Sequence, residues 1–167
     1  MSVQIPPRGT HGVRFPRFPS WLATRMSRMM ANRLRSKGGS STRGVPNVVL
    51  ETTGAQSGAL REAVVGYVAD GPDAWLIIAS AAGAAYHPQW LYNLAKNPDA
   101  TLDFGAGRRV AVRAETPSGP DLEAAWAKIA ESAPVYVGYR TKTDREIPII
   151  RLRAVDRSSA VEGEAVG

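Results

Sequence analysis

Short apolar runs, separated by small polar turns, dominate the middle of the chain. Three of them lie at 48–53, 63–69 and 74–79, and each is rich in β-branched or continuous apolar residues. That length and composition predict β-strands. Further runs at 100–104, 109–115 and 147–152 have the same character, and the glycine-bearing turn at 105–107 predicts a hairpin between the first two.

Three other segments have the spacing of helices. Segment 19–35 alternates apolar and basic residues with a helical period, which predicts an amphipathic helix followed by a flexible link at 37–41. A second, short helix is expected to begin at Pro88 and to end before Pro98, because proline suits a first helical turn but cannot continue a helix. A third is expected over 122–131. The predicted apolar stripe of the first helix consists of Leu22, Met26, Met29, Met30 and Leu34, and the core-packing face of the third consists of Leu122, Ala125, Trp126 and Ile129.

The short turns between strands favour antiparallel pairing. A small antiparallel sheet leaves few free edges when it closes on itself. We therefore expect an α+β fold, mainly β with helices, in which about six antiparallel strands form a barrel. Because a small barrel has little interior volume, a large ligand is expected in an outer groove.

Charge is distributed unevenly and suggests three parts of the chain. The protein has 21 basic and 15 acidic residues, and nine of the basic residues precede Glu51, the first acid. We expect a basic N-terminal arm at 1–43, without fixed structure at 1–17, then the barrel domain at 44–156 and a flexible tail at 157–167.

Three interpretations of the helix in the basic arm remain open. It packs its Met/Leu stripe on the barrel, or it rests on an anionic membrane with Phe18 and Trp21 at the interface, or it binds nucleic acid. The third is the weakest, since no nucleic-acid-binding module follows the arm, and we expect no nucleic-acid partner.

Several classes of site are excluded by composition. The absence of cysteine rules out disulfides, thiolate catalysis and cysteine-based zinc sites. His11 and His87 are too far apart in sequence to suggest a metal site, and none is predicted. The chain has no apolar run of spanning length and no signal core, so a cytoplasmic location is expected, with the inner face of the cell membrane as an alternative.

Two loops are candidates for ligand binding. A polar turn at 54–61 is flanked by glycines and ends in Arg61, and a loop at 80–85 consists of small residues and leads into the helix at Pro88. Such loops expose backbone N–H groups to an anion or a carbonyl oxygen. The alternative is that both are ordinary surface loops.

Three sequence blocks carry a resemblance to a known family. They are TTGAQSGALR, IASAAGAAYHPQWLYNLAKNPDA and PVYVGYRTKTDREIPII, and they fall in family order between about Pro46 and Leu152. Together they resemble the deazaflavin (coenzyme F-420)-dependent nitroreductase and quinone reductase family of actinobacteria. The resemblance implies a split β-barrel of the flavin-reductase and pyridoxamine-oxidase type. It also implies a hydride transfer from reduced F-420 to a small planar acceptor. The sequence is compatible with a monomer or a homodimer.

The resemblance also implies which residues bind the coenzyme. The turn that holds the phosphate and acidic tail corresponds to Gln56, Ser57, Gly58 and Arg61, with Ala63 following it. The loop facing the ring corresponds to Ala79, Ser80, Ala81, Ala82 and Gly83, and the adjacent helix contributes Trp90 and Asn93. The catalytic residues implied are Ser80, Tyr136 and Tyr139.

Tyr136 and Tyr139 are three residues apart, so on a helical turn they share one face. A phenol is a flat apolar wall with one donor at its tip, which suits a quinone or nitro oxygen. The alternative is that both tyrosines cap the barrel. The nearby cations Arg140, Lys142 and Arg145 attract an acidic tail or form a solvated face, and the solvated face is the default expectation.

The chain departs from the family pattern at three positions. Ala55, Gln56 and Ala81 stand where the family commonly has cations. Each charge-assisted contact to phosphate contributes roughly 1.5–3 kcal/mol, so their loss weakens binding unless Arg140 or Arg145 compensates. Two hypotheses follow: an F-420-dependent reductase, or a non-catalytic binding protein on the same barrel for a fatty acid, flavin or haem.

Overall fold

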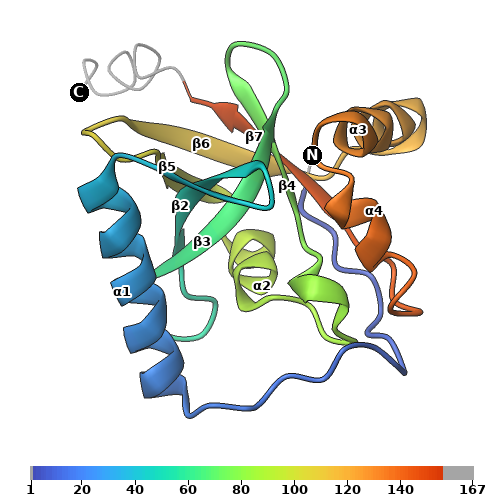
Figure 1. Ribbon diagram of the computed structural model, residues 1–167, viewed down its shortest axis with the longest axis horizontal. Coiled ribbons are helices and arrows are strands. Elements are labelled where there is room, and N and C mark those ends of the chain that lie inside the picture. Colours follow the sequence, from blue (N-terminus) through green and yellow to red (C-terminus); the bar gives the residue numbers. More distant parts are fainter. Residues whose placement is uncertain (1, 156–167) are drawn as a thin grey trace, which may run out of the picture.

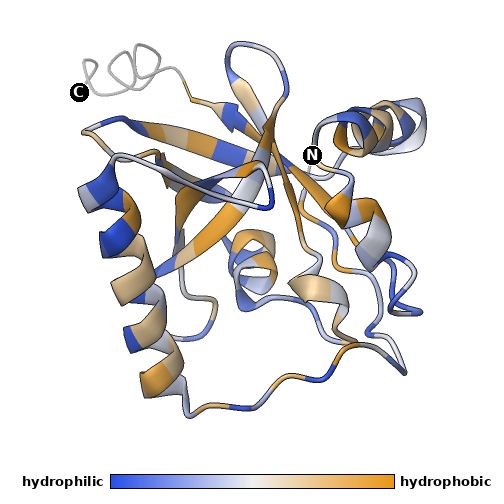
Figure 2. Cartoon of the chain, in the orientation of Figure 1, coloured by the Kyte–Doolittle hydropathy of each residue, from blue (hydrophilic) through white to orange (hydrophobic). Residues whose placement is uncertain are grey.

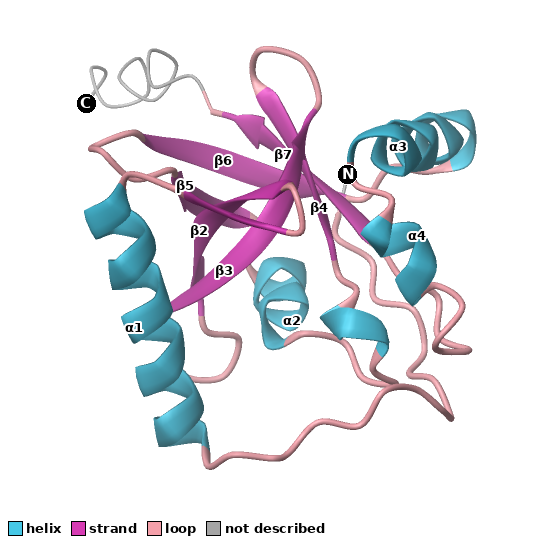
Figure 3. Ribbon diagram, viewed as in Figure 1, coloured by secondary structure: helices cyan, strands magenta, loops and turns pink. Residues whose placement is uncertain are grey.

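The computed structural model describes residues 2–155, which form seven strands, four α-helices and one 3-10 turn (Figures 1 and 3). The strands are β1 (Ser40–Thr42), β2 (Val45–Thr53), β3 (Leu60–Ala69), β4 (Ala74–Ile78), β5 (Asp99–Asp103), β6 (Arg109–Glu115) and β7 (Ile149–Ala154). The helices are α1 (Ser20–Lys37), η1 (Ala81–Gly83), α2 (Gln89–Lys96), α3 (Gly119–Ser132) and α4 (Val135–Tyr139).

Six of the strands close into an antiparallel barrel. The sheet order is β1-β2-β3-β4-β7-β6-β5, and an additional pairing of β2 with β5 joins the two ends. Leu50 in β2 lies opposite Ala63 on one side and Leu102 on the other. The predicted α+β fold, a barrel of about six antiparallel strands, is confirmed.

Side chains alternate between the barrel interior and its outer surface, as the period of a strand requires. Leu50, Ile77 and Leu102 are fully buried inside, and α2 closes one end of the barrel by adding Leu91 and Leu94 to that core. Figure 2 shows hydrophobic residues along the strands and hydrophilic residues in most of the connecting loops.

Helices cover the outer surface on two sides (Figure 1). On one side α3 and α4 cover β4, where Leu76 and Ile78 meet Ala125 and Ile129. The predicted apolar face of α3 is therefore confirmed. On the other side α1 packs on β2 and β3, with Ala31 and Leu34 against Val49 and Val64.

The prediction that the methionines of α1 belong to its packing face is wrong. Met26, Met29 and Met30 are exposed, and the packing face runs instead through Ala31, Leu34 and Arg35. Ion pairs between Arg35 and acids of the barrel fix the rotation of the helix. These partners are distant in sequence, so the periodicity of the helix alone does not reveal them.

The start of the chain is ordered, contrary to the expectation for 1–17. Val3 is buried in the barrel core, the Gly9 N–H donates to the Ala85 carbonyl, and the Val13 N–H donates to the Gly83 carbonyl. Gly12 allows this close approach, because a Cβ there would lie 2.5 Å from the Ala85 nitrogen. Residues 2–13 thus form a strap across the 80–85 loop.

The predicted flexible link at 37–41 is also wrong. Gly38 ends α1 in the left-handed conformation, with a φ of 69°, and the chain then enters β1, which pairs with β2. The predicted tail at 157–167 lies outside the described residues.

Candidate functional site

A cavity lies between α1, the 54–61 turn and the start of α2. Its volume is about 590 Å³, within the range of small-molecule sites. It is lined by Ser20, Ala23, Thr24, Ser27, Arg28, Thr52, Gly54, Ala55, Gln56, Ser57, Leu60, Arg61, Glu62, Ala63, Gln89, Trp90 and Asn93. We call it the α1 groove.

The turn that forms one wall of the α1 groove is held by its own backbone. The Gly54 N–H donates to the Ala59 carbonyl at 2.7 Å, and the Gly58 N–H donates to the Gly54 carbonyl at 2.9 Å. Gly58 has a φ of 68°, a left-handed conformation that favours glycine. The turn therefore presents the Gln56 and Ser57 side chains on a fixed backbone.

Asn93 ties this turn to α2. Its Oδ1 accepts from the Ala55 N–H at 3.0 Å, and its Nδ2 donates to the Thr52 hydroxyl at 3.0 Å. The side chain is buried, so these bonds occupy its polar atoms. Asn93 lines the α1 groove, as predicted, and its contacts are those of a residue that positions the turn.

Arg61 is a cation that lines the α1 groove. Its guanidinium donates to the Thr24 hydroxyl at 3.3 Å and to the Ser57 hydroxyl at 3.4 Å. Within residues 2–155 no carboxylate lies within ion-pair distance of Arg61 or of Arg28. Glu62, the one acid in the lining, accepts from Arg35 at 2.7 Å.

The small-residue loop lies elsewhere, at the end of β4. Ala81 and Ala82 have φ values of 43° and 52°, a conformation that L-residues other than glycine rarely adopt. Across residues 2–155, no acceptor is found for the N–H groups of either alanine. Two successive free N–H groups in such a conformation form a concavity suited to an anion or a carbonyl oxygen.

Arg145 holds this loop from within the protein. Its guanidinium donates to the carbonyls of Ala79 at 3.0 Å, Ser80 at 2.8 Å and Ala84 at 3.0 Å. Only 4% of Arg145 is exposed. Both sequence-based interpretations of Arg145, as part of a solvated face and as a cation for the acidic tail, are therefore wrong.

His87 connects Arg145 to the N-terminal strap. Its Nδ1 lies 2.8 Å from the Arg145 guanidinium and must accept, so its Nε2–H donates to the Pro6 carbonyl at 2.8 Å. Burial lowers the pKa of His87, the bond to Pro6 opposes this, and the charge of Arg145 lowers the pKa further. The histidine is therefore neutral in this arrangement.

Tyr136 and Tyr139 lie next to this loop on α4. Their ring centroids are 6.0 Å apart, in an edge-to-face arrangement. Burial raises the pKa of Tyr136, so its phenol stays protonated. A Cβ on Gly66 would lie 2.2 Å from the Tyr136 hydroxyl, which explains the glycine in the middle of β3. Sequence reasoning missed Gly66, although a glycine inside a strand often marks such a close approach.

The predicted site residues thus fall into two groups. Those that line the α1 groove are Gln56, Ser57, Arg61, Ala63, Trp90 and Asn93. Gly58 lines a second cavity of about 510 Å³, which shares residues of the turn with the groove. The second group, around the small-residue loop and α4, consists of Ala79, Ser80, Ala81, Ala82, Gly83, Tyr136 and Tyr139. The second group lines neither cavity. The two groups are connected by α2, which follows the small-residue loop in the chain and lines the α1 groove at its start.

Sequence reasoning missed the contribution of α1 to the groove. Ser20, Thr24 and Ser27 line it together with Arg28. Their spacing of four and three residues places them on one helical face. That spacing was the sequence signal for a polar face on α1, but the predicted apolar stripe was assigned from the methionines instead.

Comparisons with known proteins agree with this architecture. The model of the F-420H(2)-dependent quinone reductase family matches residues 22–153. An F-420H(2)-dependent quinone reductase of Mycobacterium tuberculosis is 37% identical over 109 residues, which cover 64% of this chain and 72% of the relative. A second M. tuberculosis protein, described as a putative enzyme of the same kind, is 34% identical over 65% of this chain and 90% of its own length.

Solved structures show the same fold. An F-420-H2-dependent reductase superimposes with a TM-score of 0.58 at 30% identity, over 66% of this chain and 95% of the other. A chain described as a domain-swapped dimer superimposes with a TM-score of 0.60 at 27% identity, over 80% and 97%. With the family model matching most of its length, this chain belongs to the F-420H(2)-dependent quinone reductases and is an F-420-dependent oxidoreductase.

Proposed function

We propose that the protein transfers a hydride from reduced F-420 to a quinone, a nitro compound or another planar acceptor, and that the α1 groove holds the anionic tail of the coenzyme. The observation that carries this proposal is the groove itself: about 590 Å³, lined by hydroxyls and by two arginines without acidic partners in the described chain. A phosphate-linked polyglutamate tail fits such a lining, because charge-assisted hydrogen bonds to phosphate are among the stronger polar contacts.

The bound coenzyme supplies the hydride, and the protein supplies binding, orientation and a proton. In this proposal Arg61 and Ser57 bind the tail from the turn. The free N–H groups of Ala81 and Ala82 face the ring, and Arg145 keeps the loop in the conformation that leaves them free.

The acceptor side belongs to α4 in this proposal. Tyr136 and Tyr139 present an apolar wall next to the loop, and a phenol that stays protonated can donate to a quinone or nitro oxygen. Ser80 is proposed as the loop hydroxyl that contacts the ring or the acceptor.

A binding titration combined with a turnover assay tests the proposal. The wild-type protein should quench F-420 fluorescence saturably and should oxidise reduced F-420 when menadione is added. Arg61→Met should weaken F-420 binding about tenfold, the value expected for one lost charge-assisted contact. Arg113→Met is the matched control, since Arg113 forms an exposed pair with Asp99 outside the groove. No binding up to millimolar F-420 would contradict the proposal.

The competing function is that of a non-catalytic binding protein for haem, flavin or a fatty acid. The observation in its favour is the set of neutral residues Ala55, Gln56 and Ala81 along the tail route. Native mass spectrometry of the protein from its host distinguishes the two, because a binding protein would carry a ligand that is not a deazaflavin.

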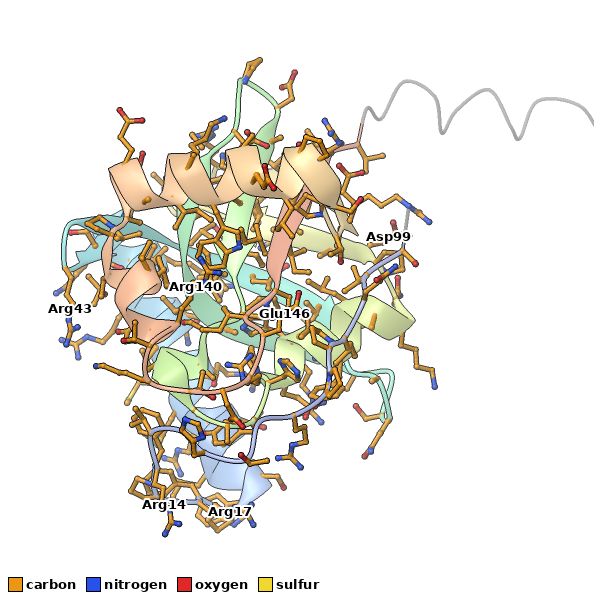
Figure 4. All side chains as sticks on the ribbon, turned by 90° about the vertical axis from the view of Figure 1, so that its right-hand side faces the viewer. Arg14, Arg17, Arg43, Asp99, Arg140 and Glu146 are labelled. Carbon is orange, nitrogen blue, oxygen red and sulfur yellow. The ribbon has the colours of Figure 1, made fainter. Side chains whose placement is uncertain are left out.

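We also propose peripheral contact with an anionic membrane. Phe18, Trp21 and Met29 are each more than half exposed on or just before α1. Arg14 and Arg17 project together at the same end of the molecule (Figure 4). An exposed apolar surface beside arginines suits a negatively charged bilayer surface. Within residues 2–155, none of the helices has the length and hydropathy needed to cross a bilayer.

Vesicle sedimentation tests this contact. The protein should cosediment with phosphatidylglycerol vesicles more than with phosphatidylcholine vesicles, and Trp21→Ser should reduce the bound fraction. Equal partition into both vesicle types, unchanged by the substitution, would contradict it.

A further inference from the structure

The groove has a wall that lies outside the three sequence blocks that carry the family resemblance. The family model covers α1 from residue 22 onward, but α1 ends at Lys37, before the first of those blocks. Four residues of α1 line the groove with polar atoms. They are Ser20, Thr24, Ser27 and Arg28. The helix is thus part of the cavity as well as a cover for the outer strands.

Arg28 is close to Arg61. The Arg61 guanidinium contacts the Thr24 hydroxyl at 3.3 Å, and Arg28 lies one helical turn beyond Thr24 on the same side of α1. Within the described chain Arg28 has no carboxylate at ion-pair distance. The groove therefore contains two neighbouring cations, one from the turn and one from the helix.

Arg140 and Arg145, the other candidate cations for binding the acidic tail, make their contacts outside the α1 groove. Arg145 is buried under the small-residue loop, and Arg140 stacks on Trp126 with 4.3 Å between its guanidinium carbon and the ring centroid. Neither lines the α1 groove. The acidic residue that does line it, Glu62, accepts from Arg35 through Oε1, and Arg35 also pairs with Glu51 and Asp103.

We propose that Arg28 of α1 is a binding residue for the anionic tail of the coenzyme and that, with Arg61, it substitutes for the cations absent at Ala55, Gln56 and Ala81. Ser20, Thr24 and Ser27 contribute hydroxyl donors on the same face. This inference rests on the proposed function, since it names further residues of the same site.

Two matched variants and two ligands test the inference. Arg28→Met removes the cation in the groove, and Arg25→Met removes an exposed cation of the same helix that does not line it. Both variants change the net charge equally. Each protein is titrated with F-420 and with the deazaflavin riboside that lacks the phosphate and glutamates, and quenching of ligand fluorescence is followed. Thermal unfolding shows that both variants are folded.

Arg28→Met should weaken F-420 binding about tenfold and leave riboside binding unchanged, while Arg25→Met should bind both ligands like the wild type. Equal F-420 affinity of the two variants would overturn the inference and leave the proposed function intact. Equal weakening of both ligands by Arg28→Met would also overturn it, because the effect would then not involve the tail. If the wild-type protein binds neither ligand, the proposed function and the inference are both wrong.

Discussion

Arg145 shows how one buried side chain can fix a loop that has little side-chain chemistry of its own. Its guanidinium binds three carbonyls of the 79–84 segment and the His87 ring. Unusual backbone conformations such as those of Ala81 and Ala82 persist only where the surroundings enforce them. Arg145 is the group that does so here.

Arg145→Met should lower the free energy of unfolding by about 3 kcal/mol, because buried carbonyls lose their donor. Urea denaturation measures this change. Arg140→Met is the control, since Arg140 is exposed and contributes a single cation–π contact. A loss below about 1 kcal/mol for Arg145→Met, similar to the control, would contradict the assigned role.

His87 makes the stability of the strap depend on pH. Burial lowers its pKa in the folded protein below the ordinary value of 6.5. The unfolded chain therefore binds the proton first as the pH falls. This part of the stability is complete above about pH 6.5 and is lost as the pH falls from there towards the folded pKa, by at most about 1.4 kcal/mol per pH unit.

Denaturation at a series of pH values between 7 and 5 tests this, with His87→Gln as the variant that lacks the effect. Asp70 and Asp103 do not interfere, because their pKa values are lowered from 3.8 and their stability losses fall at lower pH. A wild-type slope equal to that of the variant would show that His87 does not have the proposed role.

At the scale of elements, the position of α1 depends on a cluster of charges. Arg35 donates to Glu51 at 2.8 Å, to Glu62 at 2.7 Å and to Asp103 at 2.7 Å, and so links the helix to three acids on the barrel surface. Arg109 adds a second cation to Glu51 and Asp103. This cluster anchors the C-terminal half of α1, while the N-terminal half forms the wall of the α1 groove.

Arg35→Met should lower the free energy of unfolding by about 2 kcal/mol. This is less than the loss expected for breaking a fully buried ion pair, because Arg109 still pairs with two of the three acids. It should also weaken F-420 binding, since the groove loses a fixed wall. Arg33→Met is the control on the exposed face of the same helix. Unchanged stability and unchanged F-420 affinity would contradict the anchoring role of Arg35.

The elements that sequence predicts well are those whose side-chain pattern is local. The strands, α2 and α3 follow from runs and spacings that lie within each segment. The rotation of α1 does not, because the partners of Arg35 lie on β2, β3 and β5. The strap at 2–13 was missed for the same reason: its hydrogen bonds go to Gly83 and Ala85, far along the chain.

At the scale of the whole molecule, closure of the barrel brings the turn after β2 beside α2. The same turn lies close to the N-terminal half of α1. The family resemblance named six of the residues that line the α1 groove, but it gave no position for α1 because the helix precedes the three sequence blocks. It also named the loop residues Ala79 to Gly83 without the buried Arg145 beneath them. What sequence left out was the set of contacts between distant segments.

In the proposed function, the two ends of the coenzyme bind to different parts of the molecule. The α1 groove offers cations and hydroxyls for the tail, whereas the 79–83 loop and α4 offer free N–H groups and aromatic walls for the ring and the acceptor. Trp90 and Asn93 at the start of α2 line the groove, and the loop precedes them directly in the chain. In the proposed function we therefore expect the coenzyme to pass the start of α2.

A crystal structure of the protein with oxidised F-420 tests this arrangement most directly. We expect the phosphate and glutamates in the α1 groove within hydrogen-bond distance of Arg61 and Arg28, and the ring against the N–H groups of Ala81 and Ala82. A complex in which the tail lies outside the groove, or in which the ring contacts neither the loop nor α4, would contradict it.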